Sequence, residues 1–519
     1  MNFRYIYFLG IGGIGMSALA RWFQANGHEV SGYDKTPTPL TAALQAEGIA
    51  VHFDDRGEAS LPEAIRQNRL LTLVVLTPAI PQDHQEWAWL VAQDYDIRKR
   101  SQVLGVLTQG QPTIAVAGTH GKTTTSSMVA HLLHHAGVPC AAFLGGISVN
   151  LGSNLLLPPA VVPRVAEGLV GPPSSEQSAF DERNENARND SGTTTEKSRD
   201  TTSPAAPLIV VEADEYDRSF LTLHPTIAIV TSTDADHLDI YGDQASLIES
   251  FQQFVRQIQP GGTLLINHTA DPSVAAAAPF GVRVLRYGLS AAQGPELYAD
   301  NITAQGHHFH FDLHGPAGEI TDLELAMPGF HNVENMLAAA AVAQLSGVLP
   351  AALAAAVAAY RGVKRRFELI VTSADNAKVY VDDYAHHPRE IEAFLRSLRA
   401  LYPAKKLRVI FQPHLFTRTR DFVQGFADSL SLADEVVLLD IYPAREKPLL
   451  GVSSQLILDL ITAPGKSLQT KAQVLQNAAH DTEYDILATV GAGDIDTLVP
   501  ELRELLTKRW LTSASSLTN

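Results

Sequence analysis

Two glycine-rich segments hold the residues best suited by type and spacing to bind phosphate. The second of them, AVAGTHGKTTT, follows an apolar strand-like run and leads into a helix-like stretch. A turn between a strand and a helix directs backbone N–H groups and the positive end of the helix towards an anion. The phosphate-binding candidates in this segment are Gly118, Thr119, His120, Gly121, Lys122, Thr123 and Thr124.

Two side chains of this segment extend its chemistry beyond the backbone. Lys122 supplies a mobile cation for the terminal phosphates, and Thr123 has the hydroxyl that commonly coordinates Mg²⁺ in such loops. A full P-loop has a further glycine five residues before Gly121, where this chain has Val116. The sequence therefore predicts a shorter variant of the P-loop that binds a nucleotide.

The first glycine-rich segment, GIGGIG, matches G-x-G-x-x-G through Gly10, Gly12 and Gly15. It lies between a predicted strand and a predicted helix, and Asp34 stands near the end of the next strand, as in dinucleotide-binding folds. The pattern encodes a tight turn whose amides meet a diphosphate. Both NAD and a UDP-sugar contain one, so the pattern alone leaves both ligands open. The binding candidates are Gly12, Gly13, Gly15 and Asp34.

Acidic residues follow two strand-like runs downstream of the P-loop. Glu212 in VVEADEYD suits Mg²⁺, because carboxylate oxygens are its usual protein ligands. His237 in DADHLD is a less expected ligand for a hard cation, so a structural role is equally open for it. We expect Asp214, Glu215 and Asp217 to form a solvated acidic face.

A further binding candidate is the helix start in GFHNVENMLAAAA. His331 and Asn335 are four residues apart and share one helix face, where they could hydrogen-bond an adenine edge. Asn332 suits a helix cap equally well.

The elements that must position these residues alternate between strand-like and helix-like segments, the pattern of parallel sheets wound with helices. A chain of 519 residues is too long for one hydrophobic core. We predict three tandem α/β domains, at 1–107, 108–363 and 364–519. Within the second domain, the segment at about 171–207 is poor in aliphatic residues, and we expect it to be a disordered surface insertion. A tolerated loop is the simpler interpretation of it than a docking or regulatory role.

Composition narrows the classes of partner. The formal net charge of −17 opposes binding to nucleic acid, which requires clustered cations. The only cysteine, Cys140, excludes an internal disulfide and fits a reducing cytoplasm, where we expect it to be a buried apolar residue. No apolar run long enough for a membrane span is present, so we expect no membrane association.

Several motifs together resemble those of the Mur ligases, enzymes of bacterial cell-wall synthesis. The resemblance covers nearly the whole chain outside 171–207. It implies N- and C-terminal Rossmann-like domains, for the UDP-sugar and the amino acid, around a central P-loop ATPase domain. The motifs are GIGGIG, GTHGKTTT, EADEYD, DADHLD, GFHNVENMLAA, KRRFE, DDYAHHP and FQPHLFTRT.

The resemblance also implies an activity: ATP-dependent joining of L-alanine to the carboxylate of UDP-N-acetylmuramate, through an acyl phosphate, in peptidoglycan precursor synthesis. The first glycine turn would then bind the UDP diphosphate and the second would bind ATP, which removes the need for NAD. The implied cofactors are ATP and Mg²⁺, and the protein is expected to be a monomer or homodimer. The alternative within the family joins UDP-N-acetylmuramate to a preformed tripeptide during wall recycling.

Roles for single residues follow from the matching motifs. Lys122 would contact the β- and γ-phosphates, and Thr123, Glu212 and His237 would organise Mg²⁺. The resemblance thus favours metal binding for His237, and it supports His331 and Asn335 beside the adenine.

The C-terminal domain would complete the site when it closes. Arg366 and Asp382 would join the nucleotide site. The residues implied for the amino-acid and muramyl end are Tyr384, His386, His414 and Arg418. Of these, His386 is our candidate for the base that accepts the amine proton.

The chain departs from the family pattern at two places. Leu415 follows His414 where relatives can have an arginine, so we expect Arg418 to hold the alanine carboxylate largely alone. Some Mur ligases use a carbamylated lysine after the DHLD motif, but no lysine lies between His237 and Gly261. Two rival classes remain: an NAD-dependent oxidoreductase, suggested by GIGGIG but leaving GTHGKTTT unexplained, and a nucleotide-regulated binding module, which no feature of the sequence favours.

Overall fold

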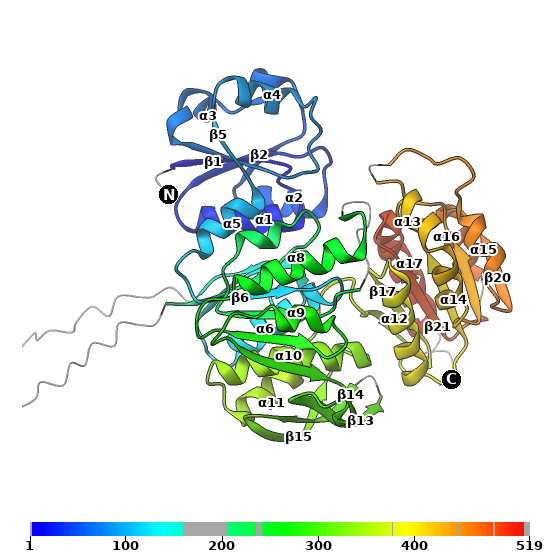
Figure 1. Ribbon diagram of the computed structural model, residues 1–519. Coiled ribbons are helices and arrows are strands. Elements are labelled where there is room, and N and C mark those ends of the chain that lie inside the picture. Colours follow the sequence, from blue (N-terminus) through cyan, green and yellow to red (C-terminus); the bar gives the residue numbers. More distant parts are fainter. Residues whose placement is uncertain are drawn as a thin grey trace, which may run out of the picture.

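The computed structural model describes residues 3–158, 206–234, 241–306, 308–375, 377–444, 446–480 and 483–512. The predicted insertion, apart from its last two residues, and His237 lie outside these ranges. The described chain forms three α/β bodies, each built on its own sheet (Figure 1). The prediction of three tandem α/β units is confirmed.

The N-terminal body is a parallel sheet of five strands in the order β3-β2-β1-β4-β5. GIGGIG follows the buried strand β1 and leads into α1, as the sequence predicts. The elements are β1 (Tyr5–Leu9), α1 (Ile14–Ala25), β2 (Glu29–Tyr33), α2 (Pro39–Ala46), β3 (Ala50–His52), α3 (Glu63–Gln67), β4 (Thr72–Leu76), α4 (Gln85–Ala92), β5 (Asp96–Lys99) and α5 (Arg100–Thr108).

The middle body has a sheet of ten strands in the order β15-β14-β13-β12-β11-β10-β6-β9-β7-β8. The seven neighbouring strands β13-β12-β11-β10-β6-β9-β7 run parallel. At one edge β8 pairs antiparallel with β7, and at the other β14 and β15 continue the sheet as antiparallel strands. The elements are β6 (Thr113–Ala117), α6 (Lys122–His135), β7 (Cys140–Ser148), β8 (Ser153–Leu156), β9 (Leu208–Glu212), β10 (Ile227–Val230), α8 (Gln244–Arg256), β11 (Thr263–Asn267), α9 (Pro272–Ala276), β12 (Arg283–Gly288), β13 (Leu297–Gln305), β14 (His308–Gly315), β15 (Gly318–Leu325), α10 (Phe330–Leu345) and α11 (Pro350–Ala359).

The C-terminal body has six strands in the order β16-β17-β21-β18-β19-β20, parallel except for β16. The elements are β16 (Glu368–Thr372), β17 (Val379–Asp383), α12 (Pro388–Leu401), β18 (Leu407–Phe411), α13 (Phe416–Asp421), α14 (Val423–Leu430), β19 (Glu435–Leu438), α15 (Ser454–Leu460), β20 (Gly465–Leu468), α16 (Lys471–His480), β21 (Ile486–Val490) and α17 (Val499–Thr512).

The middle body contacts both of its neighbours (Figure 1). On the N-terminal side, α1 packs against β7 and β8, and Arg21 on α1 donates to Asn154 Oδ1 on β8 over 2.6 Å. On the C-terminal side, α12 packs against α10 and β13. The predicted phosphate loop, at 118–124, therefore lies in the middle body, and the other two bodies flank it.

Burial agrees with the expectation for the single cysteine. Cys140, at the start of β7, is buried, and burial raises the pKa of its thiol to about 12. Among the described residues, no helix is both long and apolar enough to cross a membrane.

Candidate active site

The phosphate loop joins the fully buried strand β6 to α6, which begins at Lys122. Gly118 and Gly121 have φ values of +132° and +80°, which side chains rarely tolerate. A Cβ on Gly118 would lie 2.0 Å from Thr231 Oγ1, and one on Gly121 would lie 2.8 Å from Asn335 Oδ1. Both glycines are therefore required by the backbone turn and by close packing.

The segment after β10 holds this loop in place. The hydroxyl of Ser232 accepts a hydrogen bond from the backbone N–H of His120 over 2.9 Å and lies 2.8 Å from Thr119 Oγ1. Because β6, β9 and β10 are parallel neighbours, the residues at their carboxyl ends gather at one edge of the sheet.

Lys122 forms a buried ion pair that the sequence alone does not indicate. Its ammonium donates to Gly118 O over 2.7 Å and to Glu215 Oε1 over 2.8 Å. The Glu215 side chain is 0% exposed, so the expectation of a solvated acidic face is wrong for this residue. Burial raises the pKa of Glu215 to about 7. Burial alone would lower the pKa of Lys122, but Glu215 and its acidic neighbours raise it to about 12.

The other two residues of the acidic segment contact the N-terminal body. Asp214 pairs with Arg100 over 3.3 Å, and Asp217 lies 3.8 Å from the ammonium of Lys99. The acidic segment therefore links the phosphate site to the start of α5.

Glu212, the last residue of β9, and Thr123, near the start of α6, each contact one of two adjacent glycines of β7. A Cβ on Gly145 would lie 2.1 Å from Glu212 Oε2, and one on Gly146 would lie 3.0 Å from Thr123 Cγ2. A hydroxyl and a carboxylate beside a phosphate loop are a donor set that suits Mg²⁺. Among the described residues, no group of three or more His, Cys, Asp or Glu is arranged to hold a metal by itself.

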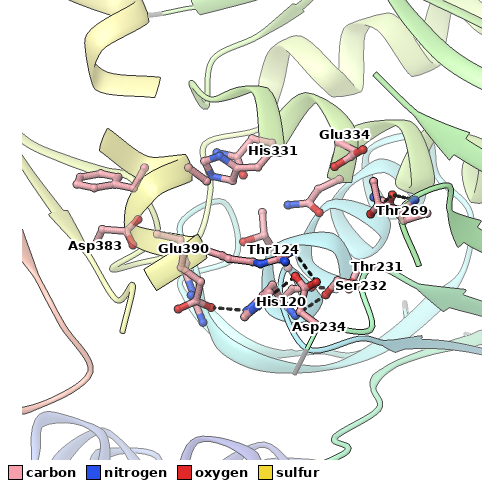
Figure 2. A pocket seen from close by; sticks show the side chains of 18 of the residues that line it. His120, Thr124, Thr231, Ser232, Asp234, Thr269, His331, Glu334, Asp383 and Glu390 are labelled. Carbon is pink, nitrogen blue, oxygen red and sulfur yellow. Dashed lines mark hydrogen bonds and ion pairs between the residues drawn. The ribbon is translucent and has the colours of Figure 1, made fainter. Parts of the chain in front are cut away.

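A cavity of about 210 Å³ lies between the middle and C-terminal bodies (Figure 2). Figure 2 shows Asp383 and Glu390 on one side of it and Thr231, Thr269 and Glu334 on the other. The predicted nucleotide residues that line it are His120, Gly121, Thr124, His331, Asn335 and Arg366.

The helix α10 supplies one wall of this cavity. Burial lowers the pKa of His331 to about 4, so this imidazole is neutral at physiological pH. The amide of Asn332 donates to Pro328 O over 2.6 Å and holds the turn before α10. Glu334, which the sequence analysis did not single out, also lines the cavity, and burial raises its pKa to about 7.

Asp382 and Asp383 occupy different environments at the end of β17. Asp382 does not line the cavity; it accepts hydrogen bonds from Thr489 Oγ1 over 2.6 Å and from Arg365 Nε over 3.1 Å. Asp383 lines the cavity and accepts from the backbone N–H of Ala385 over 2.7 Å. Adjacent strand residues face opposite sides of a sheet, which accounts for the difference.

The first glycine turn faces the middle body. The backbone N–H of Gly12 donates to Asp34 Oδ2 over 2.7 Å, so this carboxylate braces the turn. Gly13 and Gly15 line a cavity of about 230 Å³ together with Glu212 and Asp214. The glycine turn predicted to bind a diphosphate and the predicted metal ligand Glu212 therefore border the same cavity.

The residues predicted for the amino-acid end gather in the C-terminal body. The His386 ring centroid lies 5.4 Å from that of Tyr384 and 6.0 Å from that of His414. Arg418 is buried on α13, four residues along the chain from His414. Tyr442, which stacks on His414, lines a further cavity with Lys99, Arg100 and Asp214, so all three bodies meet there.

Comparison with known proteins defines the class of enzyme. Family models match residues 5–111 (Mur ligase family, catalytic domain), 116–343 (Mur ligase middle domain) and 365–495 (Mur ligase, glutamate ligase domain). The chain belongs to the Mur ligase family of ATP-dependent ligases.

Two relatives share nearly the full length of the chain. UDP-N-acetylmuramate--L-alanine ligase of Phocaeicola vulgatus is 43% identical over 506 residues, which cover 97% of this chain and 98% of that protein. The protein of the same name from Cytophaga hutchinsonii is 42% identical over 510 residues, covering 97% of each.

Solved structures agree with these relatives. UDP-N-acetylmuramate-alanine ligase MurC from Thermotoga maritima superimposes with a TM-score of 0.74 at 25% identity, covering 97% of this chain and 99% of that one. A murein peptide ligase from Psychrobacter arcticus shares the fold, with a TM-score of 0.64 at 22% identity over 97% of this chain and 98% of its own.

Proposed function

We propose that this enzyme joins L-alanine to the carboxylate of UDP-N-acetylmuramate at the expense of ATP, in peptidoglycan precursor synthesis. The observation that carries the proposal is the P-loop, whose residues line a cavity completed by the C-terminal body, in a chain similar throughout to L-alanine ligases. The recycling alternative, with a preformed tripeptide as acceptor, has the weaker support, since the murein peptide ligase is alike in fold alone.

A carboxylate does not react with an amine near neutral pH, because its oxygen is a poor leaving group. A carboxylate oxygen of the muramyl group therefore first attacks the γ-phosphorus of ATP, and the bond to the β-phosphate oxygen breaks to release ADP. The amine of L-alanine then attacks the carbonyl carbon of this acyl phosphate. The tetrahedral intermediate expels inorganic phosphate, and the amine proton passes to a base, leaving an amide.

The residues of the phosphate loop stabilise the charge that moves in the first step. Lys122 is protonated and stands at the start of α6, so it neutralises negative charge on the transferred group. Thr123, Glu212 and His237 are the residues that would hold Mg²⁺, which when bound neutralises further phosphate charge. His331 and Asn335 would contact the adenine.

The C-terminal body supplies the residues for the second step, the attack of the L-alanine amine. We assign the base to His386 and the alanine carboxylate to Arg418. The acyl phosphate hydrolyses easily, and docking of the C-terminal body over the cavity excludes water from it.

The test is release of phosphate from ATP in the presence of UDP-N-acetylmuramate and a panel of acceptors. We expect release with L-alanine, and the panel of L-serine, glycine and a preformed tripeptide measures its selectivity. Release with the tripeptide and none with L-alanine would instead establish the recycling reaction.

A further inference from the structure

Glu390 occupies the third position of α12 and caps that helix. Its Oε2 accepts hydrogen bonds from the backbone N–H groups of His386 and His387 over 3.0 and 3.3 Å. This is one half of a capping box, a local device that stabilises the helix start.

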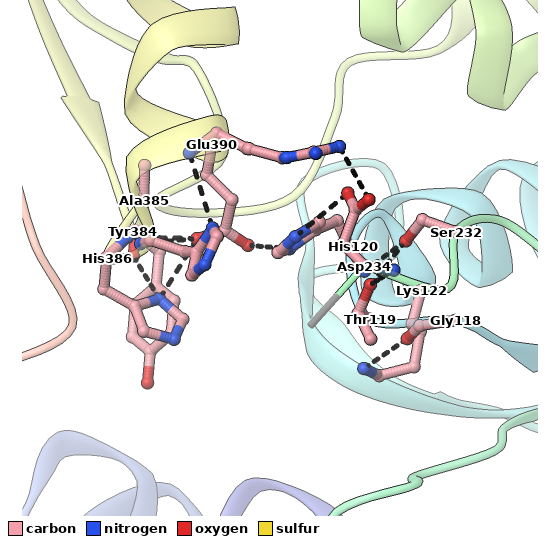
Figure 3. Close-up of polar contacts among 12 residues, drawn as sticks. Gly118, Thr119, His120, Lys122, Ser232, Asp234, Tyr384, Ala385, His386 and Glu390 are labelled. Carbon is pink, nitrogen blue, oxygen red and sulfur yellow. Dashed lines mark hydrogen bonds and ion pairs between the residues drawn. The ribbon is translucent and has the colours of Figure 1, made fainter. Parts of the chain in front are cut away.

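The other oxygen of Glu390 crosses to the middle body. Oε1 lies 3.2 Å from Nδ1 of His120, the histidine inside the phosphate loop (Figure 3). The two side chains are only 15% and 17% exposed, so the contact lies within the interface. A residue that served only as a cap would not need this second contact.

A second bridge runs beside the first. Arg389 Nη1 donates to Asp234 Oδ1 over 2.6 Å. The other oxygen of Asp234, Oδ2, lies 3.6 Å from His120 Nε2 (Figure 3). His120 therefore lies between one carboxylate of the C-terminal body and one of its own body. The phosphate loop is thus linked to the start of α12 directly, through Glu390, and indirectly, through Asp234 and Arg389.

Glu390 also contacts the predicted amino-acid end of the site. Its Oε2 lies 3.3 Å from His386 Nδ1, which in turn lies 3.1 Å from the carbonyl oxygen of Tyr384. One carboxylate is therefore shared between the loop predicted to hold ATP and the histidine that we assign to the amine.

We infer that Glu390 is a positioning residue that aligns His386 with the phosphate loop when the C-terminal body docks, so that ATP use and amide formation occur in one closed site. The inference rests on the proposed function. Burial alone would raise the pKa of Glu390, but His386, His120 and Arg366 hold it well below its usual range. The carboxylate is therefore ionised at neutral pH.

The test compares Glu390→Gln with Glu392→Gln. Glutamine can still accept the capping hydrogen bonds but removes the negative charge from the bridge to His120. The control residue Glu392 lies on the same helix, half-exposed, and pairs only with Arg396 over 2.8 Å among the described contacts. Kinetics with L-alanine, UDP-N-acetylmuramate and ATP, and calorimetric binding of UDP-N-acetylmuramate, are measured for both.

We expect Glu390→Gln to lower kcat by about tenfold, the loss typical of one charge-assisted hydrogen bond. The KM for L-alanine should rise, and phosphate release should exceed amide formation because the looser site admits water. Binding of UDP-N-acetylmuramate should stay unchanged, since its predicted cradle is in the N-terminal body. Glu392→Gln should match the wild type in every measurement.

A His120→Asn variant separates positioning from helix capping. If the bridge matters, the double variant of Glu390→Gln and His120→Asn loses no more kcat than the worse single variant. Multiplying effects, or a Glu390→Gln enzyme with normal kcat and a phosphate-to-amide ratio of one, would overturn the inference. A wild-type enzyme that released no phosphate with L-alanine would instead refute the proposed function.

Discussion

Replacing either Lys122 or Glu215 should destabilise the middle body. The loss from one substitution should be smaller when the other residue has already been replaced. The ammonium and carboxylate are 2.7 Å apart, and their side chains are 14% and 0% exposed. Removing one partner of a buried ion pair typically costs about 3 to 5 kcal/mol, because the other charge stays buried without compensation. Here Lys122 keeps its bond to Gly118 O, so we expect about 2 to 3 kcal/mol for Glu215→Gln.

The assay is a double-mutant cycle of Lys122→Met, Glu215→Gln and the combined variant. Hydrogen exchange of peptides covering β6 and α6 gives the free energy of opening of the middle body, which holds none of the four tryptophans. At pH 8 the combined variant should be less destabilised than the sum of the single variants by about 1 to 3 kcal/mol. Lowering the pH to 6 should reduce the cost of Lys122→Met, since Glu215 can then take up a proton.

Additive effects within about 0.5 kcal/mol would refute this reasoning, because they would mean that the two groups do not interact in the folded protein. An unchanged cost of Lys122→Met between pH 8 and pH 6 would contradict the raised pKa of Glu215.

Three other substitutions test separate parts of the site. Lys122→Ala should abolish ligation while calorimetric binding of UDP-N-acetylmuramate stays intact; loss of both would show that the two phosphate cradles are not independent. Arg418→Ala should mainly raise the KM for alanine, by about tenfold or more if one charge-assisted contact is lost, and an unchanged KM would exclude Arg418 from the amino-acid site. In the folded chain burial raises the pKa of Glu334 from 4.5 to about 7. Between these two pH values the folded state binds more protons than the unfolded state, so the free energy of unfolding falls as the pH rises from 4.5 to about 7. Glu334→Gln should therefore raise the stability of the nucleotide-free enzyme at pH 8 by about 1 to 2 kcal/mol and leave it little changed at pH 4, as measured by thermal unfolding; an equal effect at both pH values would contradict the assignment.

Local patterns in the sequence were sufficient to predict the three α/β units and the turn at each glycine-rich segment. The strand, turn and helix around Gly118 and Gly121 are adjacent along the chain, so their order alone indicates the loop. Burial of Cys140 likewise follows from its apolar surroundings.

Contacts between distant segments could not be predicted in the same way. The acidic run around Glu215 has the composition of a solvated face, and only the packing of β9 beside β6 brings this carboxylate to Lys122. The choice between Asp382 and Asp383 depends on which face of β17 meets the cavity, and a shift of one residue reverses it. The contact of Glu390 with His120 joins residues 270 positions apart in the chain and depends on how two bodies dock.

The most direct test of the acyl-phosphate route follows an oxygen atom. UDP-N-acetylmuramate labelled with ¹⁸O in its muramyl carboxylate is incubated with enzyme, ATP and L-alanine, and the released phosphate is analysed by mass spectrometry. We predict that each phosphate contains one ¹⁸O atom, because the carboxylate oxygen that attacks the γ-phosphorus leaves with it. Amide formed alongside phosphate that contains no ¹⁸O would contradict the account.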